Sequence, residues 1–513
     1  MAVSLARKLF PLSLGFFLPL IFLLFNVSLL QHYVFPQHTF YDIHRIVELL
    51  IFGLLGLLLI FSTQSDEFVI QTYRRLPRLL QRLIPLLFVW GFVSSLIHPA
   101  PAFSGPLWVC HLLTLFIGSL YCAGLYQRYP DKLPKIFFML LWFCGGYYLC
   151  IEWSYYALTQ YFIHFSPGIP LDTDTLIQNL RFPQFSNPRF LGQTLSWVLP
   201  FSVLPSLIFK KNKALSALLL LIPVGLWQMF WMGQSKALYL ELLLTAIFIP
   251  LLFRNQKKSL GPYLKAQGLA LVLGLLLYLV LYHWGLSLPE RTIEENAGDS
   301  GRFAIWRFTL ALASQHPWFG VGHLNFVHYS VELFNISHPH NAFLWIFVEW
   351  GWPAGGIFLL MVIWGLIQWL RFSKPPNTGS IALSAALISG LINAEFSGTL
   401  LMPVSQIFLS IVVGLSLGVY QQGRYGSEPN APVPLLFYFF LKGLIIVMTV
   451  LMLKGLFPVI LHLPEQEQAA CEQAIDLKYN SRCPIIPAYF ANYAGVETGV
   501  VEQNSFKPSS SST

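Results

Sequence analysis

Apolar runs long enough to cross a lipid bilayer recur along the 513-residue sequence, and they constrain its fold more strongly than any other feature. Because a bilayer offers the backbone no hydrogen-bond partners, such continuous runs must form helices. The runs lack the ten-residue alternation of outer-membrane barrels, so we predict an all-α, polytopic integral membrane helical bundle with about 12–13 transmembrane helices. We interpret thirteen runs as spans: 9–31, 45–62, 83–98, 104–126, 134–162, 190–209, 214–232, 236–253, 264–284, 341–370, 380–396, 404–420 and 433–460.

Basic residues gather on one side of these predicted spans. With the N-terminus inside, nineteen of the 31 lysines and arginines fall in inner loops, as the positive-inside rule expects. Membrane topology therefore explains the net charge of +8, and no nucleic-acid partner is required. Thirteen crossings also place the C-terminal tail outside, where Cys471 and Cys483 could form a disulfide in an oxidising compartment.

The predicted topology divides the chain into six regions. They are N-terminal transmembrane helices (1–162), an outer loop (163–189), central transmembrane helices (190–284), a large outer loop (285–340), C-terminal transmembrane helices (341–460) and a partly disordered outer tail (461–513).

Arginines and histidines are concentrated in the two outer loops. Before the tail, the basic residues of the outer loops are all arginines, and five of the six lie in the two long loops: Arg45, Arg181, Arg189, Arg291, Arg302 and Arg307. A guanidinium group matches phosphate oxygens bidentately, so we expect some of these arginines to contact an anionic substrate. The alternative is that they pair with loop carboxylates and stabilise the loops.

The stretch SHPHN, residues 337–341, stands directly before the apolar run that begins at residue 341. An imidazole can take a proton from a hydroxyl nucleophile, and neighbouring arginines can hold a charged leaving group. The pattern predicts a transferase that acts on a phosphate-activated lipid at the outer leaflet. A helix N-cap formed by Ser337 or Asn341 is the alternative. His338 and His340 lack the spacing of a helical metal pair, so we expect no metal and no cofactor.

Two segments resemble the signature of the O-antigen ligase and O-antigen polymerase superfamily, which includes protein O-oligosaccharyltransferases. They are SHPHNAFLWIFVEWGWPAGG (337–356) and SGRFAIWRFTLALASQHPWFGVGHLNF (300–326), and the resemblance covers roughly residues 185–420. Members of the superfamily are bacterial inner-membrane enzymes that transfer glycans from undecaprenyl pyrophosphate. The resemblance implies a metal-independent C-type glycosyltransferase fold, inversion at the sugar carbon, and an active site that faces the periplasm.

The resemblance also implies roles for individual residues. His340, next to Asn341, matches the catalytic histidine, and Arg302 matches the loop arginine that binds pyrophosphate. His338 and Asn341 are expected to contact substrate beside His340. Glu349, in the apolar run that follows, is interpreted as structural or orienting, because a carboxylate inside a membrane needs a partner.

Two segments depart from the family pattern. MGQSKALYL (232–240) has Lys236 where the family has arginine, and lysine still binds phosphate as a point charge. The family's Gly-x-x-Gly turn is replaced here by Gly351-Trp-Pro-Ala354-Gly355. NPRFLGQTLSW (187–197) resembles a ligase segment and makes Arg189 a further candidate, with a helix-start anchor as the alternative.

The sequence leaves the acceptor open. Lipid A core would make the chain an O-antigen ligase, a growing glycan a polymerase, and a pilin-type glycoprotein a protein O-oligosaccharyltransferase. The expected partners are therefore an undecaprenyl pyrophosphate-linked glycan donor, one of these acceptors and membrane lipid. A lipid-linked glycan transporter is the alternative from another class, but such a protein buries its polar groups along a path through the membrane.

Overall fold

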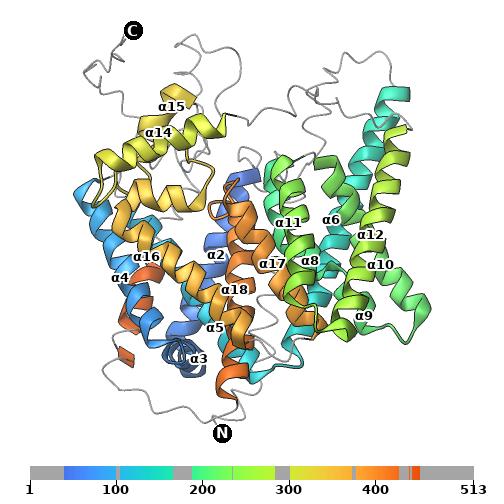
Figure 1. The fold of residues 1–513 in the computed structure, drawn as a ribbon, viewed down its shortest axis with the longest axis horizontal. Coiled ribbons are helices and arrows are strands. Elements are labelled where there is room, and N and C mark those ends of the chain that lie inside the picture. Colours follow the sequence, from blue (N-terminus) through green and yellow to red (C-terminus); the bar gives the residue numbers. More distant parts are fainter. Residues whose placement is uncertain are drawn as a thin grey trace.

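The computed structural model describes residues 40–99, 104–165, 188–233, 235–283, 301–334, 336–372, 377–426, 438–439 and 442–450. Every regular element that it assigns is a helix (Figure 1), which confirms the all-α prediction. The assigned helices are α2 (Phe40–Phe61), α3 (Thr63–Arg74), α4 (Arg78–Ile97), α5 (Ser104–Arg128), α6 (Leu133–Phe165), α8 (Pro188–Ser202), α9 (Leu204–Ile208), α10 (Lys213–Gly233), α11 (Lys236–Leu252), α12 (Lys257–His283), α14 (Arg302–Gln315), α15 (Phe326–Phe334), α16 (Ala342–Phe372), α17 (Thr378–Ala394) and α18 (Pro403–Tyr425). The predicted span 9–31, and the tail with its cysteine pair, lie outside the described residues.

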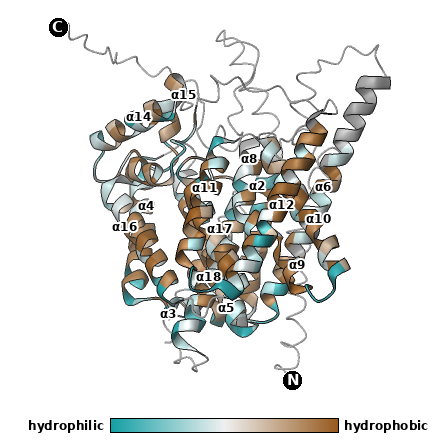
Figure 2. Ribbon diagram, turned by 45° about the vertical axis from the view of Figure 1, so that its right-hand side comes forward, coloured by the Kyte–Doolittle hydropathy of each residue, from teal (hydrophilic) through white to brown (hydrophobic). Residues whose placement is uncertain are grey.

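The long helices have the composition of membrane spans. Within the described part of the chain, eight segments are long and apolar enough to cross a bilayer: α2, α4, α5, the α8–α9 pair, α10, α12, α16 and α18. Figure 2 shows hydrophobic residues along α10 and α12, and hydrophilic residues around α3. The chain is therefore a polytopic helical membrane protein. The predicted boundary near 232–236 is present, because α10 ends at Gly233 and α11 begins at Lys236.

Three helices were not predicted from the apolar pattern. The loop assigned to 285–340 contains α14 and α15, which lie at the top of the molecule in Figure 1, and α3 lies at the bottom. We call these the upper and lower ends. Both unpredicted upper helices are too short to span a bilayer, so a search for long apolar runs does not find them.

The α5–α18 pair lies at the centre of the bundle, with α4 and α16 to one side and α10 and α12 to the other (Figure 1). Small residues let α5 and α18 approach closely, since a Cβ on Gly414 would lie 2.6 Å from the Ser119 carbonyl oxygen. Across the same contact, the Ser410 hydroxyl donates to the Leu115 carbonyl at 2.9 Å. This packing fixes the upper end of α18 and the turn that precedes it.

Helix α16 is kinked at Gly351, whose φ of 85° and ψ of 171° are not helical. A Cβ there would lie 2.2 Å from the Trp318 carbonyl oxygen, so the residue must be glycine. Segment 316–323 fits into the kink. Three backbone hydrogen bonds join the two: Val321 N to Val348 O (2.9 Å), Gly322 N to Glu349 O (3.0 Å) and Trp352 N to Pro317 O (2.8 Å). The two segments that carry the family resemblance therefore form one structural unit.

The same kink explains how the chain tolerates its altered glycine turn. A Cβ on Gly355 would lie 2.2 Å from the Phe347 ring, whereas Ala354 is accommodated in a fully buried position. Only the first and last glycines of the turn are therefore required by the packing.

Candidate active site

The SHPHN segment lies at the upper end, directly before α16. The rings of His338 and His340 are in contact, with centroids 4.3 Å apart and an interplanar angle of 66°. Both side chains are partly exposed. His340 has a φ of 54°, in the left-handed region that few non-glycine residues adopt. Such a conformation persists only where the surroundings enforce it, and it is common at functional sites.

Side-chain hydrogen bonds on either side hold His340 in this conformation. Trp306 Nε1 of α14 donates to the Pro339 carbonyl at 3.1 Å. The Asn341 side chain caps α16 by accepting from the Leu344 amide at 2.9 Å, so one of the two proposed N-caps is present. These contacts fix the backbone on both sides of the imidazole.

Arg302, the first residue of α14, lies next to this segment through two aromatic contacts. Its Cζ is 5.9 Å from the centroid of the Phe396 ring, and the Trp306 ring is 6.0 Å from the same ring. Because Trp306 also binds Pro339, the contacts run from Arg302 to the residue preceding His340. The predicted base and the arginine predicted to bind pyrophosphate are thus linked through Pro339, Trp306 and Phe396.

The turn between α17 and α18, residues 395–402, forms the other wall of the site. The Asn341 amide donates to the Glu395 carbonyl at 3.2 Å. A Cβ on Gly398 would lie 2.7 Å from His338 Nε2, so this glycine packs directly against the imidazole. Glu395 lies directly beyond the end of α17, beside Asn341.

A buried arginine supports the α17–α18 turn from within the bundle. Arg45 of α2 is fully buried, forms an ion pair with Glu48 and donates to the Leu401 carbonyl at 2.5 Å. Its Nη1 also donates to Gln406 Oε1 at 2.5 Å, and Gln406 in turn donates to the Leu400 carbonyl at 2.7 Å. Arg45 was predicted among the outer arginines, and the structure gives it a role in positioning the turn.

Lys236 lies at the start of α11, which contacts α17, and Arg189 lies near the start of α8, which contacts the turn. Glu241, less than two turns after Lys236, accepts from Ser196 of α8 at 2.6 Å and from Asn393 of α17 at 2.9 Å. One turn after Arg189, Gln193 donates to Ser397 of the turn at 2.6 Å, while the Arg189 side chain lies outside the described residues. Phosphate binding by these two residues stays a prediction.

A second histidine of the loop, His323, is structural. It is fully buried, its Nδ1 lies 2.6 Å from the Glu349 carboxylate, and Trp350 Nε1 donates to the same nitrogen at 3.1 Å. This pairing agrees with the interpretation of Glu349 as a structural residue. Within the described residues, no group of three His, Cys, Asp or Glu side chains is arranged to hold a metal ion.

The residues that the sequence did not single out are those of the α17–α18 turn. Phe396 and Gly398 carry no motif, and they reach the histidines only through the packing of α17 and α18. Glu395 did carry a signal, since a carboxylate at the end of an apolar run needs a partner.

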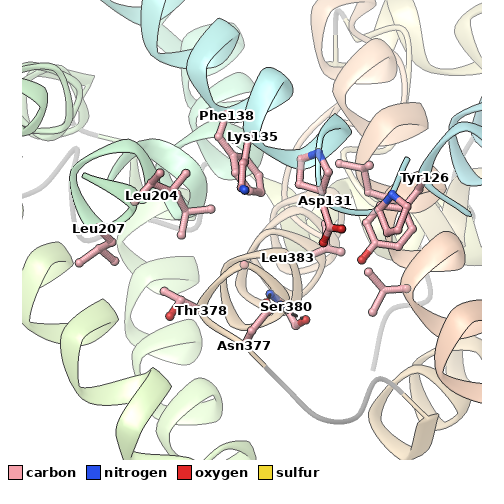
Figure 3. A pocket seen from close by; sticks show the side chains of 16 residues that line it. Tyr126, Asp131, Lys135, Phe138, Leu204, Leu207, Asn377, Thr378, Ser380 and Leu383 are labelled. Atoms are coloured by element: carbon pink, nitrogen blue, oxygen red, sulfur yellow. Dashed lines mark hydrogen bonds between the residues drawn. The ribbon is translucent and has the colours of Figure 1, made fainter. Parts of the chain in front are cut away.

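Another hollow, of about 330 Å³, lies at the lower end and is lined by Tyr126, Asp131 and Lys135 (Figure 3), far along the bundle from these histidines.

Replacing Gly398 with alanine is expected to reduce activity about tenfold to a hundredfold, because a methyl group would displace the His338 ring and disturb its contact with His340. Gly356→Ala is the matched control, since nothing lies within 4 Å of a Cβ at that position. Activity and thermal unfolding of both purified variants check this. Equal activity of the two variants at equal stability would contradict it.

Part of the chain matches a known protein family. Residues 214–359 match the family model described as O-antigen ligase. A search of curated proteins found no match. The matched region includes Lys236, Arg302, both contacting histidines and the kink of α16. Residues 214–359 of this chain are therefore similar to the O-antigen ligase family.

Proposed function

We propose that this protein transfers a glycan from undecaprenyl pyrophosphate to an acceptor hydroxyl at the periplasmic face of the bacterial inner membrane. The hydrogen bond from Trp306 of α14, the helix that begins at Arg302, to the carbonyl of Pro339, which stands between the paired histidines, carries this proposal. The O-antigen ligase match supports the reaction class, since enzymes of this family act on lipid-linked glycans and acceptors. The excess of basic residues at the lower end supports an orientation with the histidines outside.

In the proposed mechanism, His340 removes the proton of the acceptor hydroxyl. The acceptor oxygen then forms a bond to the anomeric carbon as the bond from that carbon to the pyrophosphate oxygen breaks, with inversion. Undecaprenyl pyrophosphate leaves with the electron pair of the broken bond, and Arg302 stabilises its negative charge together with Lys236 and Arg189. Pyrophosphate is a good leaving group, so no protonating acid and no metal is invoked.

Lys236 offers a test of leaving-group binding, because charge alone should suffice there. Lys236→Arg is expected to keep or raise activity, since a guanidinium makes two charge-assisted bonds where an ammonium acts as a point charge. Lys236→Met is expected to lower the rate about tenfold to a hundredfold, by loss of an interaction of about 1.5–3 kcal/mol. Transfer in membranes at matched protein levels measures both. An active Met variant would mean that Lys236 only extends from the start of α11 to the membrane interface, and that the arginines bind pyrophosphate without it.

Deletion of the gene, followed by parallel analysis of lipopolysaccharide and periplasmic glycoproteins, identifies the acceptor. Loss of O-antigen from lipid A core indicates a ligase, shortened glycan chains indicate a polymerase, and unglycosylated pilin-type protein indicates an O-oligosaccharyltransferase. No change in any of the three would contradict the proposed function.

A further inference from the structure

Four arginines converge at the lower end of the bundle, opposite the histidines. Arg74 ends α3, Arg78 begins α4, Arg371 lies in the last turn of α16, and Arg424 lies in the last turn of α18. They line one hollow of about 700 Å³, and no acidic residue is among its described lining residues. Four elements from distant parts of the sequence thus bring arginines to one site.

An apolar groove of about 300 Å³ runs on from this hollow into the bundle. The two share Leu76, Pro77 and Gln368, so they adjoin each other. The groove is lined by residues of α4 and α16 on one side and of the central helices α17 and α18 on the other. Its lining is almost entirely apolar and includes Phe358 and Trp369.

We propose that the arginine hollow and the apolar groove together bind one anionic diacyl phospholipid of the inner-facing leaflet. The phosphate would lie among Arg78, Arg371 and Arg424, whose side chains are exposed, and an acyl chain would fill the groove. Basic pockets between transmembrane helices on the cytoplasmic side bind anionic lipid headgroups in this way. This inference does not depend on the proposed glycan transfer.

The position of the site distinguishes its ligand from the glycan donor. The arginines and the histidines lie at opposite ends of α16, which is 31 residues long, so a lipid headgroup here is remote from the reaction. The neighbouring hollow of Figure 3 lacks this charge bias, because Asp131 accompanies Lys135 in its lining. The arginine hollow is thus suited to a headgroup that carries net negative charge.

The headgroup is tested with the full-length protein purified in mild detergent and mixed with phosphatidylglycerol or phosphatidylcholine. Native mass spectrometry then counts the phospholipids that stay bound. The wild-type protein is expected to retain phosphatidylglycerol, and the variant Arg78→Gln/Arg371→Gln/Arg424→Gln to retain it at least tenfold less. The matched control, Lys210→Gln/Lys211→Gln/Lys213→Gln, removes three exposed charges at the same end and is expected to bind like the wild type.

The groove is tested by filling it. Gly365 lines the groove with nothing within 4 Å of a Cβ, so Gly365→Phe places a ring in the acyl-chain path without a clash at its base. Gly356→Phe is the control on the same helix, equally open but outside the groove. Loss of bound phosphatidylglycerol in Gly365→Phe but not in Gly356→Phe supports the proposal. This comparison tests the proposal even if the arginine variant fails to fold.

Three results would overturn the inference. They are equal retention of phosphatidylglycerol by the arginine variant and the lysine control, equal retention by the two phenylalanine variants, and displacement of phosphatidylglycerol by undecaprenyl pyrophosphate at equal concentration. None of these measurements involves glycan transfer, so their outcome is independent of the proposed function.

Discussion

His340→Asn is expected to lower glycan transfer about 10²–10⁴-fold, because it removes the general base. Asparagine is the most informative replacement, because it removes the imidazole but tolerates the left-handed φ of 54° that His340 adopts. The backbone of the segment therefore stays unstrained. His338→Ala is expected to have a smaller effect, through the loss of its ring contact with His340. Transfer and thermal unfolding of both purified variants are measured together.

The result is interpretable only if the variants fold. His340→Asn with the unfolding temperature of the wild type and no transfer supports the assignment of the base. Full activity of that variant would remove the catalytic role of His340, and equal loss from both variants would mean that the two histidines act jointly.

Gly351→Ala is expected to disrupt the upper end of the protein. The new methyl group would meet the Trp318 carbonyl oxygen at 2.2 Å, and the positive φ adds strain of about 1–3 kcal/mol. Relief of the clash separates segment 316–323 from the kink and breaks backbone hydrogen bonds between them. We expect a lower unfolding temperature together with loss of transfer, because the histidines lie directly before α16.

Gly365→Ala is the matched control for this prediction, since it lies in the same helix with open space around its Cβ and an ordinary helical backbone. It is expected to be neutral or slightly stabilising, because alanine favours a helix more than glycine. Equal unfolding temperatures for Gly351→Ala and Gly365→Ala would contradict the role of the kink.

The sequence predicted the membrane bundle well, because length and hydrophobicity are local properties of each run. It also identified His338, His340 and Arg302 as candidates, and the structure places them in one region at the upper end. The boundary between α10 and α11 was visible because the polar residues of GQSK interrupt the apolar pattern.

The remainder of the site depends on contacts between distant segments, which periodicity does not reveal. Phe396 and Gly398 reach the histidines only because α17 and α18 pack against the centre of the bundle, and Arg45 supports their turn from more than 350 residues away. The fit of segment 316–323 into the α16 kink depends on positive φ angles at Gly320, Gly322 and Gly351, which a motif indicates only indirectly.

The most direct test of the central claim is the release of undecaprenyl pyrophosphate from a labelled lipid-linked glycan by the purified protein in liposomes. The release is measured with and without each acceptor: lipid A core, a glycan chain and a pilin-type protein. We predict release that requires one of these acceptors, forms one new glycoside per pyrophosphate lipid and is lost in His340→Asn. Release that is independent of acceptor and of His340, or no release with any acceptor, would contradict the account.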